Sequence, residues 1–148
     1  LSTLISKASY REMIKPYHRQ MFDYVHKNYP DVKVFLHSCG AIYDLIPDLI
    51  DAGVDILNPV QISASGMNPE RLKAEFGKDL VFWGGGANMQ DTVMNRSIEE
   101  IRDEVSRLID IFSQGGGYVF NQVHNIQANV PPEKIMAIYD TALAKRGK

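Results

Sequence analysis

Four apolar segments of strand length, each followed by a stretch with helical periodicity, constrain the fold of this chain more than any other feature. The strand-like segments are Val32–His37, Val54–Val60, Leu80–Trp83 and Tyr118–Val123. A further helix is expected from Ser9 to about Val25, ahead of the first strand, with Pro16 either kinking it or moving its start. Strands that alternate with helices in this way predict a parallel sheet covered by helices.

Capping residues mark the ends of the predicted helices. Gly53 closes a helix over Ile42–Ala52, and Asn68 with Pro69 opens the next helix, which Gly77 ends. Ser97 and Glu100 form a capping box at the start of the third helix, which runs to Phe112 before Gly115–Gly117 stops it. The last helix begins at Pro131–Glu133.

Four βα units are half of a (β/α)8 barrel. A flavodoxin-like sheet is the alternative for a short chain, but it usually has five strands, and the leading helix here has no strand before it. We therefore expect an α/β fold, half of a TIM barrel with a leading helix, as one partial domain over residues 1–148. Because open sheet edges tend to pair, we expect the chain either to form a homodimer or to be a fragment of a longer barrel.

Composition excludes several classes of function. The 148 residues carry a net charge of −2, which argues against a nucleic-acid partner. The longest apolar stretches run about 6 residues, far below the ~20 that cross a bilayer, so no membrane span is expected. With Cys39 as the only cysteine, no internal disulfide can form, and a reducing, cytoplasmic location is expected.

Polar, uncharged side chains follow each predicted strand, where a barrel presents its active site. His37 and Cys39 point the same way after the first strand. The chain is expected to bind a small-molecule substrate through Asn58, Gln61, Trp83, Gln90 and Asn121, with Trp83 as core or pocket wall. Gly84–Gly86 is expected to leave room for a close ligand, and Gly115–Gly117 to form a turn.

A neutral site with soft ligands suits zinc better than Mg²⁺ or Ca²⁺. Three protein ligands and one open position make a catalytic zinc site, and His37, Cys39 and His124 supply three such ligands. The simpler interpretation is a buried cysteine and a hydrogen-bonded histidine at a strand end. His18 and His26 lie among charged neighbours on the leading helix and are assigned to the surface.

Several motifs together resemble the C-terminal half of the uroporphyrinogen decarboxylase superfamily. The most specific are Gly117–His124 and Asn129–Glu133, which are similar to a Gly-x-x-Phe-Asn-Leu-Gly-His followed by Val-Pro-Pro-Glu. Ala52–Asp55 and Trp83–Gln90 fit as well. The resemblance spans nearly the whole chain and implies the second half of a (β/α)8 barrel of the TIM type, with the missing N-terminal half-barrel as its expected partner.

The superfamily contains cofactor-free decarboxylases and zinc-dependent, corrinoid-linked methyltransferases. His37–Gly40 resembles the methyltransferase branch, whose zinc ligands include that His and Cys; their third ligand is typically a Cys, and His124 stands at or near its position. His124 also matches a substrate-pocket His of the decarboxylases, whereas Gln90 replaces the Asp that follows Gly-Asn-Met in that branch. The resemblance also implies that the decarboxylases use an Asp and Arg residues from the N-terminal half.

Three functions follow as hypotheses. The first is zinc-dependent methyl transfer to a thiol acceptor, with a methylcobalamin-like corrinoid on a partner protein as donor. The catalytic residues would be His37, Cys39 and His124. The second is metal-free decarboxylation of uroporphyrinogen in porphyrin biosynthesis, a carboxy-lyase activity. The third is an inactive half-barrel fragment or homodimeric scaffold.

Overall fold

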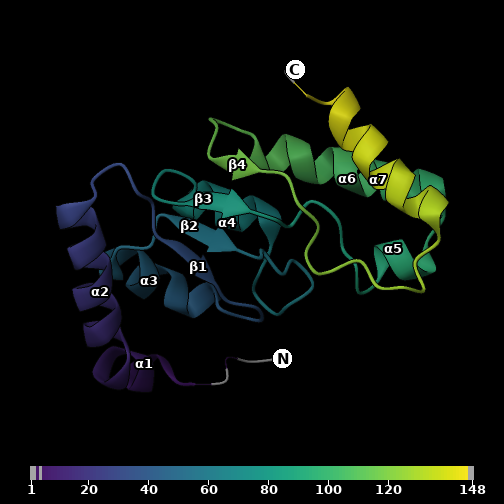
Figure 1. The fold of residues 1–148 in the computed structure, drawn as a ribbon. Helices are drawn as coiled ribbons and strands as arrows, with labels where there is room; N and C mark the ends of the chain where they lie inside the picture. Colours follow the sequence, from purple (N-terminus) through teal and green to yellow (C-terminus); the bar gives the residue numbers. More distant parts are fainter. Residues whose placement is uncertain (1–2, 4, 147–148) are drawn as a thin grey trace.

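The computed structural model describes residues 3 and 5–146 and has the predicted order of strands and helices. Four parallel strands form one sheet in the order β1-β2-β3-β4, with β1 at Phe35–His37, β2 at Ile56–Asn58, β3 at Val81–Trp83 and β4 at Tyr118–Val119. Helices α1 and α2 stand at one end of the molecule and α6 and α7 at the other, with the strands between them (Figure 1). The fold is therefore a partial (β/α) barrel, as expected.

The helices begin and end close to where the capping residues place them. They are α1 (Lys7–Met13), α2 (Lys15–Asn28), α3 (Ile46–Ala52), α4 (Pro69–Phe76), α5 (Thr92–Asn95), α6 (Ile98–Phe112) and α7 (Pro132–Ala144). The capping box of Ser97 and Glu100 is present at the start of α6. Gly115–Gly117 forms the predicted turn after α6, with positive φ at all three glycines. The short helix α5 has no counterpart in the sequence-based prediction.

Proline divides two of the predicted helices. The leading helix breaks at Ile14, so that Pro16 occupies the first turn of α2, where its missing N–H is not needed. The predicted helix from Ile42 begins instead with a 3₁₀ turn over Tyr43–Leu45 and becomes α3 at Ile46, with Pro47 in the first turn. Both prolines thus end the preceding segment and start a new helix.

The strands are shorter than their apolar runs because side chains and irregular loops take backbone groups out of the ladder. The Val34 N–H donates to Asp55 Oδ2 at 2.7 Å, so β1 begins only at Phe35. After Val119 the chain stays beside the loop that follows β3, with Gly86 N–H donating to Asn121 O at 2.8 Å, but the regular ladder has ended.

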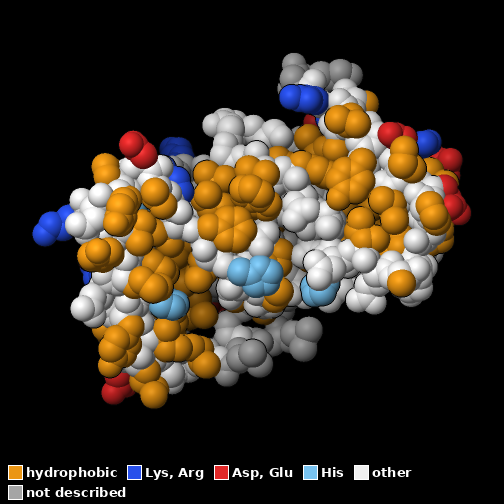
Figure 2. Space-filling model, viewed as in Figure 1, with side chains coloured by type: hydrophobic (Ala, Val, Ile, Leu, Met, Phe, Trp, Pro, Cys, Tyr) orange, Lys and Arg blue, Asp and Glu red, His pale blue; other side chains and the backbone are white. Residues whose placement is uncertain are grey.

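The two faces of the sheet have different surroundings. Leu57 and Phe82 are fully buried against the helices that cover one face. On the opposite face the Phe35 and Trp83 rings meet edge to face, with 5.3 Å between their centroids, and Phe35 is 45% exposed. In the space-filling view, hydrophobic side chains gather over the strand region as well as over the helices (Figure 2). This exposed face corresponds to the interior of a complete barrel.

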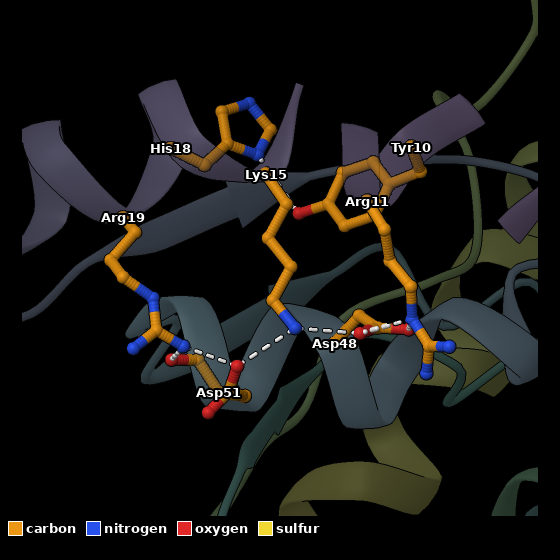
Figure 3. Close-up of polar contacts among 7 residues, drawn as sticks. All are labelled: Tyr10, Arg11, Lys15, His18, Arg19, Asp48 and Asp51. Atoms are coloured by element: carbon orange, nitrogen blue, oxygen red, sulfur yellow. Dashed lines mark hydrogen bonds and ion pairs between the residues drawn. The ribbon is translucent and has the colours of Figure 1, made fainter. Parts of the chain in front are cut away.

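A network of charged side chains joins the leading helices to α3. Asp48 is 3% exposed and accepts from Arg11 Nε at 2.9 Å and from Lys15 Nζ at 2.6 Å. Lys15 also pairs with Asp51 at 2.7 Å, and Arg19 pairs with the same carboxylate. Figure 3 shows these side chains reaching across from the leading helices to α3. The leading helices are therefore part of the folded unit.

No helix in residues 3 and 5–146 has the length and apolar character of a membrane span; the longest, α6, has 15 residues.

Candidate functional site

The polar residues predicted from the strand ends lie together at the carboxyl ends of the parallel strands. A pocket of about 200 Å³ is lined by the last residues of β1 and β2 and by residues that follow β2 and β4, namely His37, Asn58, Pro59, Asn121, Gln122, Val123, His124 and Asn125. An adjacent pocket of about 190 Å³ shares His124 and Asn125 and adds Gln90 from the loop after β3. The carboxyl ends of the parallel strands thus place these side chains together, as they do in barrel enzymes.

His37 and Cys39 form a close pair at the end of β1. Both side chains are exposed, and His37 Nε2 lies 3.5 Å from Cys39 Sγ. Around a tetrahedral zinc ion with Zn–S of about 2.3 Å and Zn–N of about 2.0–2.1 Å, a sulfur and a nitrogen ligand stand about 3.5 Å apart. The spacing of the pair therefore fits two ligands of one zinc ion.

His124 is not part of that pair. Among the described residues, no three His, Cys, Asp or Glu side chains are close enough together to hold a metal ion. His124 lines the same pocket as His37, and its place in the predicted set of three ligands stays a prediction.

Asn58 is bound to its neighbours on both sides. It is buried, its Oδ1 lies 2.8 Å from His37 Nδ1, and its Nδ2 donates to Trp83 O at 3.0 Å. Asn58 also lines the pocket of about 200 Å³ together with His37, and the substrate contact expected from sequence stays a prediction.

Gln61 and Gln90 are joined to each other and to the loop that carries Cys39. Gly40 N–H donates to Gln61 Oε1 at 2.7 Å, and Gln61 Nε2 donates to Gln90 Oε1 at 3.1 Å. The Ser63 hydroxyl donates to the same Gln90 oxygen. Ser63 was missed in the sequence, although its place in the loop after β2 could have suggested it. These bonds connect the loops that follow three strands.

Three other sequence-based assignments, one for a glycine and two for histidines, need correction. Gly86 leaves no space for a ligand, since a Cβ there would lie 2.4 Å from Phe120 Cε2; the glycine lets β3's loop pack against that ring. His18 is half-buried, bonded to Tyr10 Oη at 3.1 Å and stacked on Phe22. His26 is also half-buried and lies 2.8 Å from Asp55 Oδ2. These two histidines support the fold and are not simple surface residues.

Comparison with known proteins identifies a family for nearly the whole chain. Residues 1–144 match the family described as Uroporphyrinogen decarboxylase (URO-D). A uroporphyrinogen decarboxylase of Chloroherpeton thalassium is 28% identical over 150 residues, which are 99% of this chain and 40% of that protein. One from Chlorobium limicola is 29% identical over 144 residues, 94% of this chain and 38% of that protein. The chain thus spans about two fifths of these relatives.

Proposed function

The chain belongs to the uroporphyrinogen decarboxylase family, and from that premise we propose that it forms part of an enzyme that transfers a methyl group to a thiol at a zinc site. The observation that carries this proposal is the pair of His37 Nε2 and Cys39 Sγ at 3.5 Å. The pair lies at the carboxyl ends of the strands, where a barrel enzyme has its active site.

His37 and Cys39 would hold the metal. The third protein ligand would be His124, which lines the same pocket as His37, or a residue from the part of the relatives that this chain does not span. When bound, zinc would supply Lewis acidity, which stabilises a thiol acceptor as its thiolate at neutral pH. A methylated corrinoid on a partner protein would be the methyl donor.

The remaining polar residues of the site would orient the substrate. Asn121 is half-buried and lines the same pocket as His37, and His124 lines both pockets. The two pockets are lined without any Lys, Arg, Asp or Glu side chain. Such a site suits a neutral acceptor and a methyl group better than a substrate with several carboxylates, which would need cationic partners.

The test is the metal content of the purified chain. We expect zinc to bind in near-stoichiometric amount, and Co²⁺ in its place to give the absorption of a thiolate-bound ion. His37→Ala and Cys39→Ser should each abolish both signals, whereas Ser38→Ala, between the two ligands, should keep them. His124→Ala decides whether that residue is the third ligand. A folded chain that binds neither ion would contradict the zinc site.

A second candidate function is the metal-free decarboxylation of uroporphyrinogen. It is favoured by the relatives, because six that align with 94% or more of this chain are all named uroporphyrinogen decarboxylase. The cationic groups for such a substrate would have to come from outside this chain's strand ends. Porphyrinogen turnover by the complete protein, unchanged by a chelator and by Cys39→Ser, would support this function against methyl transfer.

A further inference from the structure

The two bonds of the Asn58 side chain fix the orientation of its amide. Trp83 O is a backbone carbonyl and can only accept, so the group facing it must be the amide NH₂ of Asn58. The amide oxygen is then the group that faces His37 Nδ1 at 2.8 Å. Because Asn58 is buried, turning the amide over would set two acceptors against each other at Trp83 without water to separate them.

The amide orientation in turn fixes the proton on the His37 ring. An amide oxygen only accepts, so Nδ1 must carry the hydrogen that it receives. A neutral imidazole has one N–H, and Nε2 is then left with its lone pair. That nitrogen is the one that lies 3.5 Å from Cys39 Sγ.

We propose that Asn58 is a positioning residue that holds His37 in the Nδ1–H tautomer and so presents the Nε2 lone pair beside Cys39. The tautomer follows from the hydrogen bonds alone; only the identity of what Nε2 binds, a zinc ion, rests on the proposed function. Hydrogen bonds of this kind, to the far nitrogen of a ligating histidine, fix the ring orientation and raise its basicity as a metal ligand.

Gln61 has a parallel place three residues further along the chain. Its Oε1 accepts from the N–H of Gly40, the residue after Cys39, at 2.7 Å. Asn58 therefore bonds to the histidine of the pair, and Gln61 bonds to the loop that carries the cysteine. Gln61 does not touch the His37 ring in any hydrogen bond of the described residues, so it offers a control that separates loop position from tautomer.

The direct test is ¹⁵N NMR of the labelled, metal-free chain at about pH 8. Long-range ¹H–¹⁵N correlations distinguish the protonated from the unprotonated ring nitrogen, and His37→Ala assigns the signals. We expect Nδ1 of His37 to be protonated in the wild-type chain. Protonation of Nε2 there would overturn the proposal, without reliance on any variant.

Variants test the role of Asn58. Asn58→Leu should shift His37 toward the Nε2–H tautomer, while Gln61→Leu and the exposed, pocket-lining Asn125→Leu should leave it as Nδ1–H. Amide spectra of each variant show whether it is folded. A folded Asn58→Leu chain that keeps the Nδ1–H form would overturn the assignment to Asn58.

Metal binding separates this inference from the proposed function. If the site holds zinc, Asn58→Leu should weaken Co²⁺ binding about 10- to 100-fold, the range found when such outer partners are removed. A wild-type chain with the Nδ1–H tautomer and no metal affinity supports the inference and contradicts the zinc site. Metal affinity that Asn58→Leu does not reduce would contradict the positioning role.

Discussion

Asp48 shows how a single buried carboxylate determines the contact between the leading helices and the barrel half. It lies on α3, is 3% exposed and receives hydrogen bonds from Arg11 and Lys15. Burial by itself would raise the pKa of Asp48, but the hydrogen bonds and charges of Arg11 and Lys15 outweigh it and hold the pKa below the ordinary 3.8. The ionised form is therefore the stable form in the folded chain.

We predict that Asp48→Asn lowers the free energy of unfolding by about 2 kcal/mol, since Lys15 loses a charged partner in a partly buried site. Urea denaturation followed by circular dichroism measures the change. Asp51→Asn is the matched control, because the Asp51 side chain is 56% exposed and its ion pairs are screened by water, so its effect should be clearly smaller. Equal effects of the two substitutions would contradict this account.

The same residue predicts a pH dependence. Since the pKa of Asp48 is lower in the folded than in the unfolded chain, its contribution is fully present above pH 3.8 and is lost as the pH falls through the folded-state value. The wild-type chain should accordingly lose stability below about pH 4. The loss of stability should be smaller in Asp48→Asn. If both chains lose stability in parallel as the pH falls, the pH dependence does not come from Asp48.

At the scale of elements, helix α6 is the best-specified segment of the chain. Its Ser97 hydroxyl accepts from Glu100 N–H at 3.2 Å, and the Glu100 carboxylate accepts from Ser97 N–H at 2.8 Å. The Ser97 N–H bond also lowers the pKa of Glu100. Ile101, Val105 and Leu108 are fully buried along one side of this helix. Local capping and the apolar stripe agree here, which is why the predicted and observed boundaries coincide.

We predict that Ser97→Ala destabilises the chain by about 1 kcal/mol, the usual loss when an N-cap is removed. Ser113→Ala, at the other end of α6, is the control, because Ser113 is exposed and only its backbone takes part in the cap. Thermal or urea denaturation of the two variants gives the comparison. A loss at Ser113 as large as that at Ser97 would show that the capping box is not the cause.

At the scale of the whole molecule, the sheet is open. Among the described residues, β1 and β4 each pair with a strand on one side only. Beside the β1 edge, Phe35 is 45% exposed on the face that would be the interior of a complete barrel. Unpaired strand edges next to exposed apolar side chains favour association with another chain.

We therefore expect the isolated chain to self-associate in a concentration-dependent manner. Size-exclusion chromatography with light scattering, over a dilution series, measures this. Phe35→Lys should shift the population toward monomer, while Met136→Lys, on the exposed surface of α7, should not. A chain that stays monomeric at every concentration would show that the open face is stable in water without a partner.

Sequence alone determined the alternation of strands and helices, most helix boundaries, and the set of polar residues at the strand ends. These features depend on signals that act within a few residues, such as the cap at Ser97 or the apolar run before His37. The family resemblance was likewise visible in the motifs and is confirmed over residues 1–144. The assignment to zinc-dependent methyl transfer remains a proposal.

Only the tertiary structure decided how those residues meet. The bond of Asn58 to His37 joins residues 21 positions apart, and the pocket that His37 shares with His124 brings together residues from the first strand and from the segment after the last. The packing of Gly86 against Phe120 depends likewise on the path of the chain after β4. Local periodicity predicts which segments form strands, but distances between segments follow from strand register and side-chain packing, which no short stretch of sequence contains.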